Sequence, residues 1–124
     1  MAERVYCLYR GKNQESILMQ KNACHDFAEK KGWNIVGEEQ EIDVSGYKVS
    51  ADTCDKLQRI REAAERGEFD IFLVFMYDRL GRNLNETPFI AKWFTKKGIH
   101  VWSVYEGEII DGVDAERMLD YIRF

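Results

Sequence analysis

The protein has 124 residues, of which 45% are hydrophobic and 32% charged, and this size fits one domain of roughly 100–150 residues. A single proline excludes a proline-rich linker, the 13% of aromatic residues argues against intrinsic disorder, and no apolar run approaches the roughly 18 residues of a membrane span. The net charge of -4 gives no overall basic surface, so a nucleic-acid function requires locally clustered cations or a further domain.

The three cysteines, Cys7, Cys24 and Cys54, are an odd number at scattered spacing. This pattern indicates reduced thiols rather than a disulfide framework or a zinc site, and it is typical of a cytoplasmic protein. No repeat or domain boundary is visible, so we expect residues 1–124 to form a single domain.

The first half of the chain alternates strand and helix patterns. Residues 5–9 are apolar, β-branched and aromatic, which predicts a strand. Apolar residues then recur near helical spacing, which predicts a helix over about 14–31 that ends at Gly32. A second strand is expected from residue 33 and continues as an extended acidic segment to residue 44, before a loop without period.

The second half centres on residues 71–76, which are apolar at every position. Strands that are buried on both faces of a parallel sheet have this composition. Helices are expected on either side of this strand, the first of them capped by Asp52 or Thr53. A fourth strand is expected over 99–105.

With a last helix expected from Asp111 or Asp114, the predicted order of elements is βαβαβαβα. Such alternation predicts an α/β fold with a mostly parallel sheet of about four strands and helices on both faces. Open sheets of this class place their sites at the carboxyl ends of the strands. Three segments qualify, which begin at Arg10, Asp43 and Tyr77.

The segment after the most buried strand, Asp78-Arg79-Leu80-Gly81-Arg82, is the strongest candidate for chemistry. Two arginines three positions apart can converge on one anion, because a guanidinium offers planar, paired donors that suit phosphate oxygens. Asp78 can orient a guanidinium or transfer a proton. We expect Arg10, at the end of the first strand, to join Arg79 and Arg82 in one crevice. The alternative is a solvated turn with surface arginines.

Other candidate groups are less specific. Gln20 lies about two turns into the first expected helix, where a surface amide is the common alternative. His25 and His100 have no ligand spacing with cysteines or carboxylates, so no metal site is expected, and the absence of phosphate-loop and dinucleotide motifs predicts no cofactor. Four acidic residues could bind a metal but are expected to be solvated: Glu38, Glu39, Glu41 and Asp43.

Several blocks of the sequence together resemble the resolvase/invertase family of serine site-specific recombinases. These blocks are Tyr9-Arg10, Gln20, Val44-Ser45-Gly46 and the run from Leu73 to Arg82. The resemblance extends from Val5 to the end of the chain, and the Asp-Arg-Leu-Gly-Arg string after an apolar strand is its most specific part. The family's catalytic domain is a parallel-sheet α/β fold, which agrees with the predicted elements.

The resemblance implies a function in DNA recombination. Members of this family attack a backbone phosphate of DNA with a serine hydroxyl, hold the 5′ end as a phosphoserine ester and release a 3′ hydroxyl. The ester conserves the bond energy, so rejoining needs no nucleotide cofactor. DNA is the implied partner, and the parent proteins act as homodimers or tetramers.

The resemblance also assigns roles to individual residues. It implies that three arginines clamp the scissile phosphate and offset the charge of the transition state: Arg10, Arg79 and Arg82. Asp78 would orient a guanidinium or handle a proton, and Gln20 would be a supporting polar contact. Ser45 and Gly46 would belong to a mobile loop beside the site.

The sequence departs from the family in three ways. The family has a serine two residues after the arginine matched by Arg10, whereas here Gly11-Lys12-Asn13 follows, and the nearest serine, Ser16, falls in the expected helix. Cys54 stands where the family commonly has an arginine, and a thiol cannot supply that charge. The chain also ends before the long dimerisation helix and the DNA-binding domain of the family.

Two explanations of the missing serine are open. We favour a segment between Arg10 and Gly11 that is absent from the printed sequence; the other explanation is a true loss, which gives an inactive relative that binds DNA or partner subunits. In both cases this polypeptide as written is expected to be inactive. A flavodoxin-like signalling or nucleotide-binding domain is a third alternative, against which the missing phosphate loops weigh.

Overall fold

The computed structural model describes residues 3–42, 55–80 and 87–109 of the chain. Its strands are β1 (Arg4–Gly11), β2 (Asn34–Ile42), β3 (Ile71–Val74), β4 (His100–Ser103) and β5 (Gly107–Ile109). Its helices are α1 (Gln14–Lys31), α2 (Asp55–Glu65) and α3 (Thr87–Lys96), with the short 3₁₀ turn η2 (Tyr77–Arg79) after β3. The last expected helix and the loop at 45–50 fall outside the described residues.

The strands form one sheet in the order β2-β1-β3-β4-β5. The first four are parallel, and β5 pairs with β4 in the antiparallel direction. The expected α/β class and mostly parallel sheet are therefore confirmed, and the three-residue edge strand β5 adds a fifth strand to the four that the sequence predicts. The strand expected over 71–76 ends at Val74, where the chain bends toward η2.

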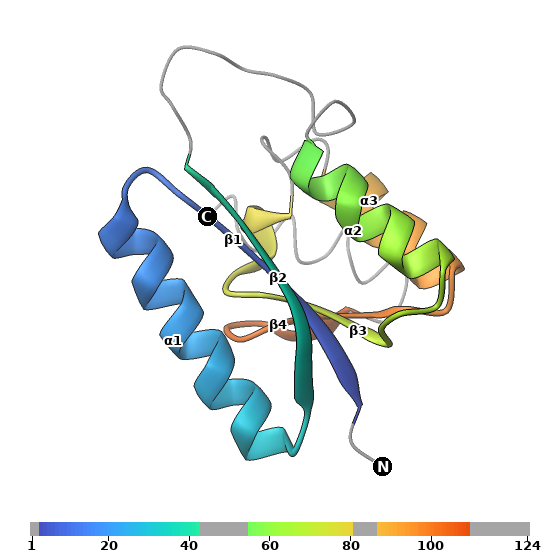
Figure 1. The fold of residues 1–124 in the computed structure, drawn as a ribbon, viewed down its shortest axis with the longest axis horizontal. Helices are drawn as coiled ribbons and strands as arrows, with labels where there is room; N and C mark the ends of the chain where they lie inside the picture. Colours follow the sequence, from blue (N-terminus) through green and yellow to red (C-terminus); the bar gives the residue numbers. More distant parts are fainter. Residues whose placement is uncertain (1–2, 43–54, 81–86, 110–124) are drawn as a thin grey trace.

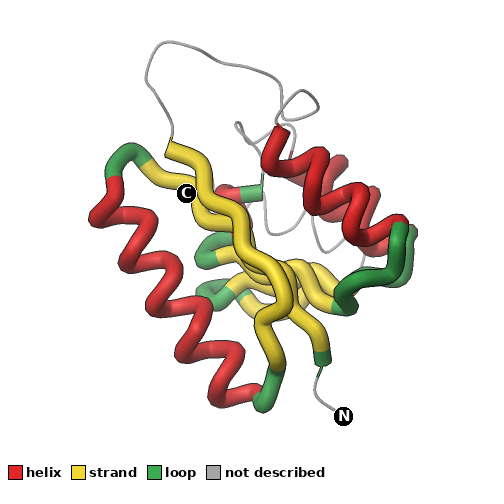
Figure 2. The backbone as a smooth tube through the Cα atoms, in the orientation of Figure 1, coloured by secondary structure: helices red, strands yellow, loops and turns green. Residues whose placement is uncertain are grey.

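Helices cover both faces of the sheet, as the sequence predicts (Figure 1). Helix α1 lies on one face, and α2 and α3 lie together on the other, with the strands between them (Figure 2). The bounds of α1 match the prediction, because Asn13 caps its first turn through a hydrogen bond from the backbone N–H of Ser16 and Gly32 ends it at a φ of 75°.

Alternation along β1 divides its side chains between two hydrophobic cores. Val5, Cys7 and Tyr9 pack with the inner face of α1, whereas Leu8 packs with α2 and α3. Arg10 has the parity of Leu8, so its side chain projects on the α2–α3 side of the sheet.

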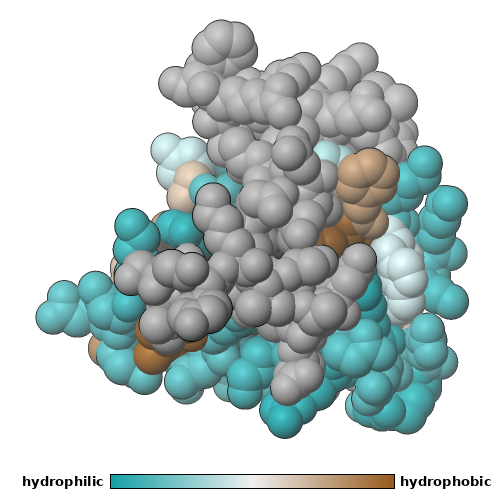
Figure 3. Space-filling model, turned by 90° about the horizontal axis from the view of Figure 1, so that it is seen from above, coloured by the Kyte–Doolittle hydropathy of each residue, from teal (hydrophilic) through white to brown (hydrophobic). Residues whose placement is uncertain are grey.

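The carboxyl ends of β2, β1 and β3 are neighbours in the sheet, and those of β2 and β1 lie in the upper part of Figure 1. Viewed onto this end, the described surface is mostly hydrophilic, with small, separate hydrophobic patches (Figure 3). No helix among the described residues is long and apolar enough to cross a membrane.

Candidate functional site

Arg10 is held from the α1 side through its backbone. The backbone N–H of Arg10 donates to Oε1 of Gln20 at 3.1 Å, and Nε2 of Gln20 donates to the Arg10 carbonyl at 2.8 Å. Gln20 is fully buried, so the surface-amide alternative is wrong. The same Nε2 also donates to Oγ of Ser16 at 3.2 Å, which ties the first turn of α1 to the end of β1.

The guanidinium of Arg10 lies on the other side of β1. It contacts both the end of β2 and the turn η2 that follows β3. Its Nη1 donates to the backbone carbonyl of Arg79 at 3.2 Å, and its Nη2 lies 3.3 Å from Oε2 of Glu41, near the end of β2. The exposed fractions of the Arg10 and Glu41 side chains are 7% and 12%, so this ion pair is largely removed from solvent.

The turn η2 places Asp78 and Arg79 at the end of β3. Tyr77 and Leu80, which flank them, are fully buried and anchor the turn, while Asp78 and Arg79 remain partly exposed. Nε of Arg79 lies 3.7 Å from Oδ1 of Asp78, which is an ion contact but too long for a hydrogen bond. Neither of these two atoms has a hydrogen-bond partner among the described residues.

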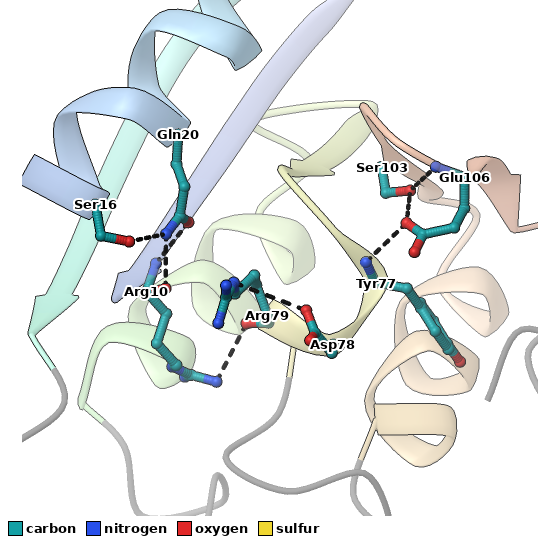
Figure 4. A network of polar contacts seen from close by, with 8 residues as sticks. All are labelled: Arg10, Ser16, Gln20, Tyr77, Asp78, Arg79, Ser103 and Glu106. Atoms are coloured by element: carbon teal, nitrogen blue, oxygen red, sulfur yellow. Dashed lines mark hydrogen bonds and ion pairs between the residues drawn. The ribbon is translucent and has the colours of Figure 1, made fainter. Parts of the chain in front are cut away.

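Glu106 fixes the start of this turn from the β4–β5 connection. Its Oε1 accepts hydrogen bonds from the backbone N–H of Tyr77 at 3.0 Å and from Oγ of Ser103 at 2.5 Å. The backbone N–H of Glu106 donates in turn to Oγ of Ser103 at 2.9 Å. Burial raises the pKa of the Tyr77 phenol, and the charge of Glu106 adds to this shift. Figure 4 shows Asp78 and Arg79 on the turn that faces Arg10, and Glu106 on a separate segment that contacts the start of this turn at Tyr77.

In the structure, β1 continues through Arg10 and Gly11, just before the position at which the family has its nucleophile. Arg10 and Gly11 pair with Glu41 and Ile42, consecutive residues of β2, so β1 runs through them without a break. The expectation of a missing segment between Arg10 and Gly11 in the printed sequence stays a prediction. A Cβ atom on Gly11 would lie 2.5 Å from Oγ of Ser16 and 2.9 Å from its Cβ, which leaves no room for a side chain there.

The predicted site residues are brought together only in part. Arg10, Gln20, Asp78 and Arg79 form one connected cluster at the strand ends (Figure 4). Three other predicted site residues lie outside the described residues: Ser45, Gly46 and Arg82. Cys54, at which the sequence departs from the family, also lies outside them. Glu41 and Glu106 are part of the cluster, and the sequence analysis did not assign them to it.

The acidic run was misjudged. Glu38 accepts a hydrogen bond from the Tyr9 hydroxyl at 2.6 Å and lies 2.7 Å from Nε2 of His25, while Glu39 accepts one from the Tyr6 hydroxyl at 3.1 Å. Together with the Arg10 pair of Glu41, these contacts show that the expectation of a solvated run is wrong for the partly buried Glu39 and Glu41. Glu38 is exposed despite its contacts, and Asp43 lies outside the described residues. The alternation of β2 was the available signal, since it places Glu39 and Glu41 on one face and Glu38 on the other. No group of three or more potential metal ligands occurs in the described part of the chain.

Three comparisons place this fold among known proteins. The family model described as "Resolvase, N terminal domain" matches residues 10–122. The N-terminal catalytic domain of TP901-1 integrase is similar, with a TM-score of 0.76 and 26% identity over 98% of this chain and 94% of that one. A search of curated proteins found no match.

Two further solved structures share the fold at 21% identity. A resolvase family site-specific recombinase from Streptococcus pneumoniae has a TM-score of 0.76, with coverage of 98% of this chain and 86% of that chain. The C-terminal catalytic domain of ISC1926 TnpA, an IS607-like serine recombinase, has a TM-score of 0.69 with coverage of 96% and 79%. The chain belongs to the resolvase family of serine recombinases and corresponds to their catalytic domain.

Proposed function

We propose that this protein is a catalytically silent recombinase domain, which contacts the DNA backbone at the strand-end cluster but forms no phosphoserine. The observation that carries the proposal is the end of β1. Two residues after Arg10 stands Lys12, an exposed cation, where the family has its serine. Gly11 meanwhile packs directly against Ser16, so the strand passes into α1 without a nucleophile-bearing loop.

Phosphate recognition is supported by the donors that remain. Arg10 and Arg79 lie together, and Arg82 follows three residues later in the sequence. Guanidinium groups match phosphate oxygens with paired, charge-assisted hydrogen bonds. Nε of Arg79 is buried without a hydrogen-bond partner among the described residues, which suits a donor that is completed by a ligand. In this proposal Asp78 orients Arg79, Gln20 fixes Arg10, and Ser45 and Gly46 lie beside the bound strand.

Ser16 is a poor substitute for the missing nucleophile. Its Oγ accepts a hydrogen bond from Gln20 on the α1 side of the sheet. The guanidinium of Arg10 lies on the opposite side of the strand end, toward η2 (Figure 4). A phosphate held by that guanidinium is therefore not presented to the Ser16 hydroxyl, and the hydrogen bonds of Ser16 among the described residues include no base that could take its proton.

In the parent recombinases the catalytic domain acts in dimers or tetramers, and the proposal extends to that arrangement. A silent subunit still contributes phosphate contacts to a mixed assembly while it withholds one strand cleavage. Sedimentation velocity of this chain, alone and mixed with an active member of the family, tests whether it forms such assemblies.

The central experiment separates binding from chemistry. The protein is incubated with thymidine 5′-(p-nitrophenyl phosphate), a phosphodiester with a good leaving group, and its intact mass is measured. No covalent adduct and no p-nitrophenol are expected, and Ser16→Ala is the matched control. An adduct that maps to Ser16 would show that the domain is not silent.

Titration with inorganic phosphate, followed through the Nε–H signals of Arg10 and Arg79 by NMR, tests binding, and unchanged signals would contradict the proposed phosphate site.

A further inference from the structure

Glu41 holds the position at Arg10 that a phosphate oxygen would take. Its carboxylate lies 3.3 Å from Nη2 of Arg10, and both side chains are nearly excluded from solvent. Carboxylate and phosphate oxygens use the same guanidinium donors in the same planar arrangement. An external phosphate and Glu41 therefore compete for Arg10.

The other glutamates of β2 have different partners. Glu38 contacts Tyr9 and His25 on the α1 side. Glu39 contacts Tyr6 and lies 3.9 Å from Nζ of Lys56 and 3.6 Å from Nη1 of Arg59, both on α2. These contacts tie β2 to the surrounding helices. Glu41 differs because it forms an ion pair with Arg10, which is proposed to bind phosphate.

The place of Glu41 in the fold makes its displacement easy. It is the penultimate residue of β2, and among the described strands β2 lies at the edge of the sheet and pairs with β1 alone. The ends of secondary-structure elements are among the parts of a fold that open at low free energy. The side chain of Arg10, in contrast, is fixed to the carbonyl of Arg79, and its backbone is fixed to Gln20.

We propose that Glu41 is a built-in counter-ion that closes the phosphate clamp, so that a DNA phosphate reaches Arg10 only when this carboxylate is displaced or neutralised. The inference rests on the proposed function, since it describes the regulation of the same site. It assigns to Glu41 a role that lowers phosphate affinity, whereas a purely supporting residue would raise it.

The test compares two substitutions with the same change in net charge. Glu41→Gln keeps the shape of the side chain but removes the competing charge, and Glu39→Gln is the matched control two residues away on the same face of β2. Inorganic phosphate is titrated into each variant and into the unmodified protein, and binding is followed through the Nε–H signal of Arg10. We expect Glu41→Gln to bind phosphate about tenfold more tightly, which is about 1.4 kcal/mol, and Glu39→Gln to bind it as the unmodified protein does.

The outcomes distinguish the two proposals. If Glu41→Gln binds phosphate with equal or lower affinity than the unmodified protein, the counter-ion role is overturned but phosphate recognition is not. If Glu39→Gln gains as much phosphate affinity as Glu41→Gln, the effect is one of net charge and the counter-ion role is also overturned. Absence of binding at Arg10 in every variant overturns the proposed function itself. If Glu41→Gln does not fold, Glu41→Asp is used instead, because it keeps the charge but shortens the side chain by one methylene. Its affinity for phosphate is expected to exceed that of the unmodified protein, and an unchanged affinity contradicts the inference.

Discussion

Gln20 on α1 binds both backbone polar groups of Arg10 on β1, as donor to the carbonyl and as acceptor from the N–H. β1 has β2 and β3 as neighbours, but β3 ends at Val74, which pairs with Leu8, so no described strand pairs with Arg10 on the β3 side. The buried amide of Gln20 replaces that missing strand. This explains why a fully buried glutamine is placed two turns into a helix that otherwise buries apolar residues.

Gln20→Ala is expected to lower the free energy of unfolding by about 2–4 kcal/mol, because it leaves two buried backbone groups of Arg10 without partners. Chemical denaturation followed by far-UV circular dichroism measures the change. Gln40→Ala, at an exposed position of β2, is the control and is expected to change stability by less than about 0.5 kcal/mol. Equal effects of the two substitutions would show that the Gln20 bonds contribute little.

Gly11→Ala is expected to destabilise the protein by about 1–3 kcal/mol, because the added Cβ would lie 2.5 Å from Oγ and 2.9 Å from Cβ of Ser16. Ser16→Gly removes both atoms, so the double variant should lose less stability than the sum of the two single variants. A double-mutant cycle by denaturation measures this coupling. If the two losses of unfolding free energy simply add, the end of β1 and α1 can move apart at no cost in stability. Space for a nucleophile-bearing loop would then be available between them.

The elements that carry the site were largely predictable from local sequence. Asn13 and Gly32 mark the two ends of α1, and an uninterrupted apolar run marks β3 as a central strand. Parallel order then places Arg10 and Arg79 at the same edge of the sheet, where they are found. The family assignment also removes the flavodoxin-like alternative.

The missed features depend on contacts between distant segments. Glu41 meets Arg10 only because β2 pairs with β1 in one register, and a shift by one residue would turn Glu41 to the other face. Glu106 accepts the Tyr77 N–H across 29 positions, and β5 is too short for its alternation to be recognised. Neither local propensity nor hydrophobic period encodes such pairings.

Glu106→Ala is expected to destabilise the protein by about 1–3 kcal/mol and to speed amide hydrogen exchange at Tyr77, since the N–H of Tyr77 and the hydroxyl of Ser103 lose their acceptor. Glu108→Ala is the control in the same segment, because the carboxylate of Glu108 pairs with the exposed ring of His100 and not with η2. Protection of the Tyr77 amide that survives Glu106→Ala would show that η2 is held by its own packing.

Stability below neutral pH should depend on Glu38. Burial acts to raise the pKa of this carboxyl, but hydrogen bonds from His25 and Tyr9 outweigh it, so the pKa is lowered from its ordinary value of 4.5. A lowered folded-state pKa contributes stability above the unfolded value, and this contribution is lost as the pH falls below 4.5 through the folded-state value. The melting temperature of Glu38→Gln should therefore lie below that of the unmodified protein at pH 7 and approach it toward pH 3. The exposed Glu62→Gln is the control, and parallel curves for Glu38→Gln and the unmodified protein would contradict the assignment.

Binding of the isolated chain to duplex DNA should be weak and steeply dependent on salt. The net charge is -4, and affinity for DNA comes largely from cations that neutralise phosphates. If Arg10, Arg79 and Arg82 supply three phosphate contacts, the logarithm of the binding constant should fall with the logarithm of salt concentration at a slope of about -2.7, or about 40-fold between 50 and 200 mM salt. Fluorescence anisotropy with a labelled duplex of mixed sequence measures both the affinity and the salt slope.

Arg79→Gln should reduce the salt slope by about one unit. Lys30 is an exposed cation in the last turn of α1, so Lys30→Gln should leave the slope unchanged. A sub-micromolar dissociation constant at about 150 mM salt, or a slope that Arg79→Gln does not alter, would place the DNA-binding surface elsewhere on the molecule.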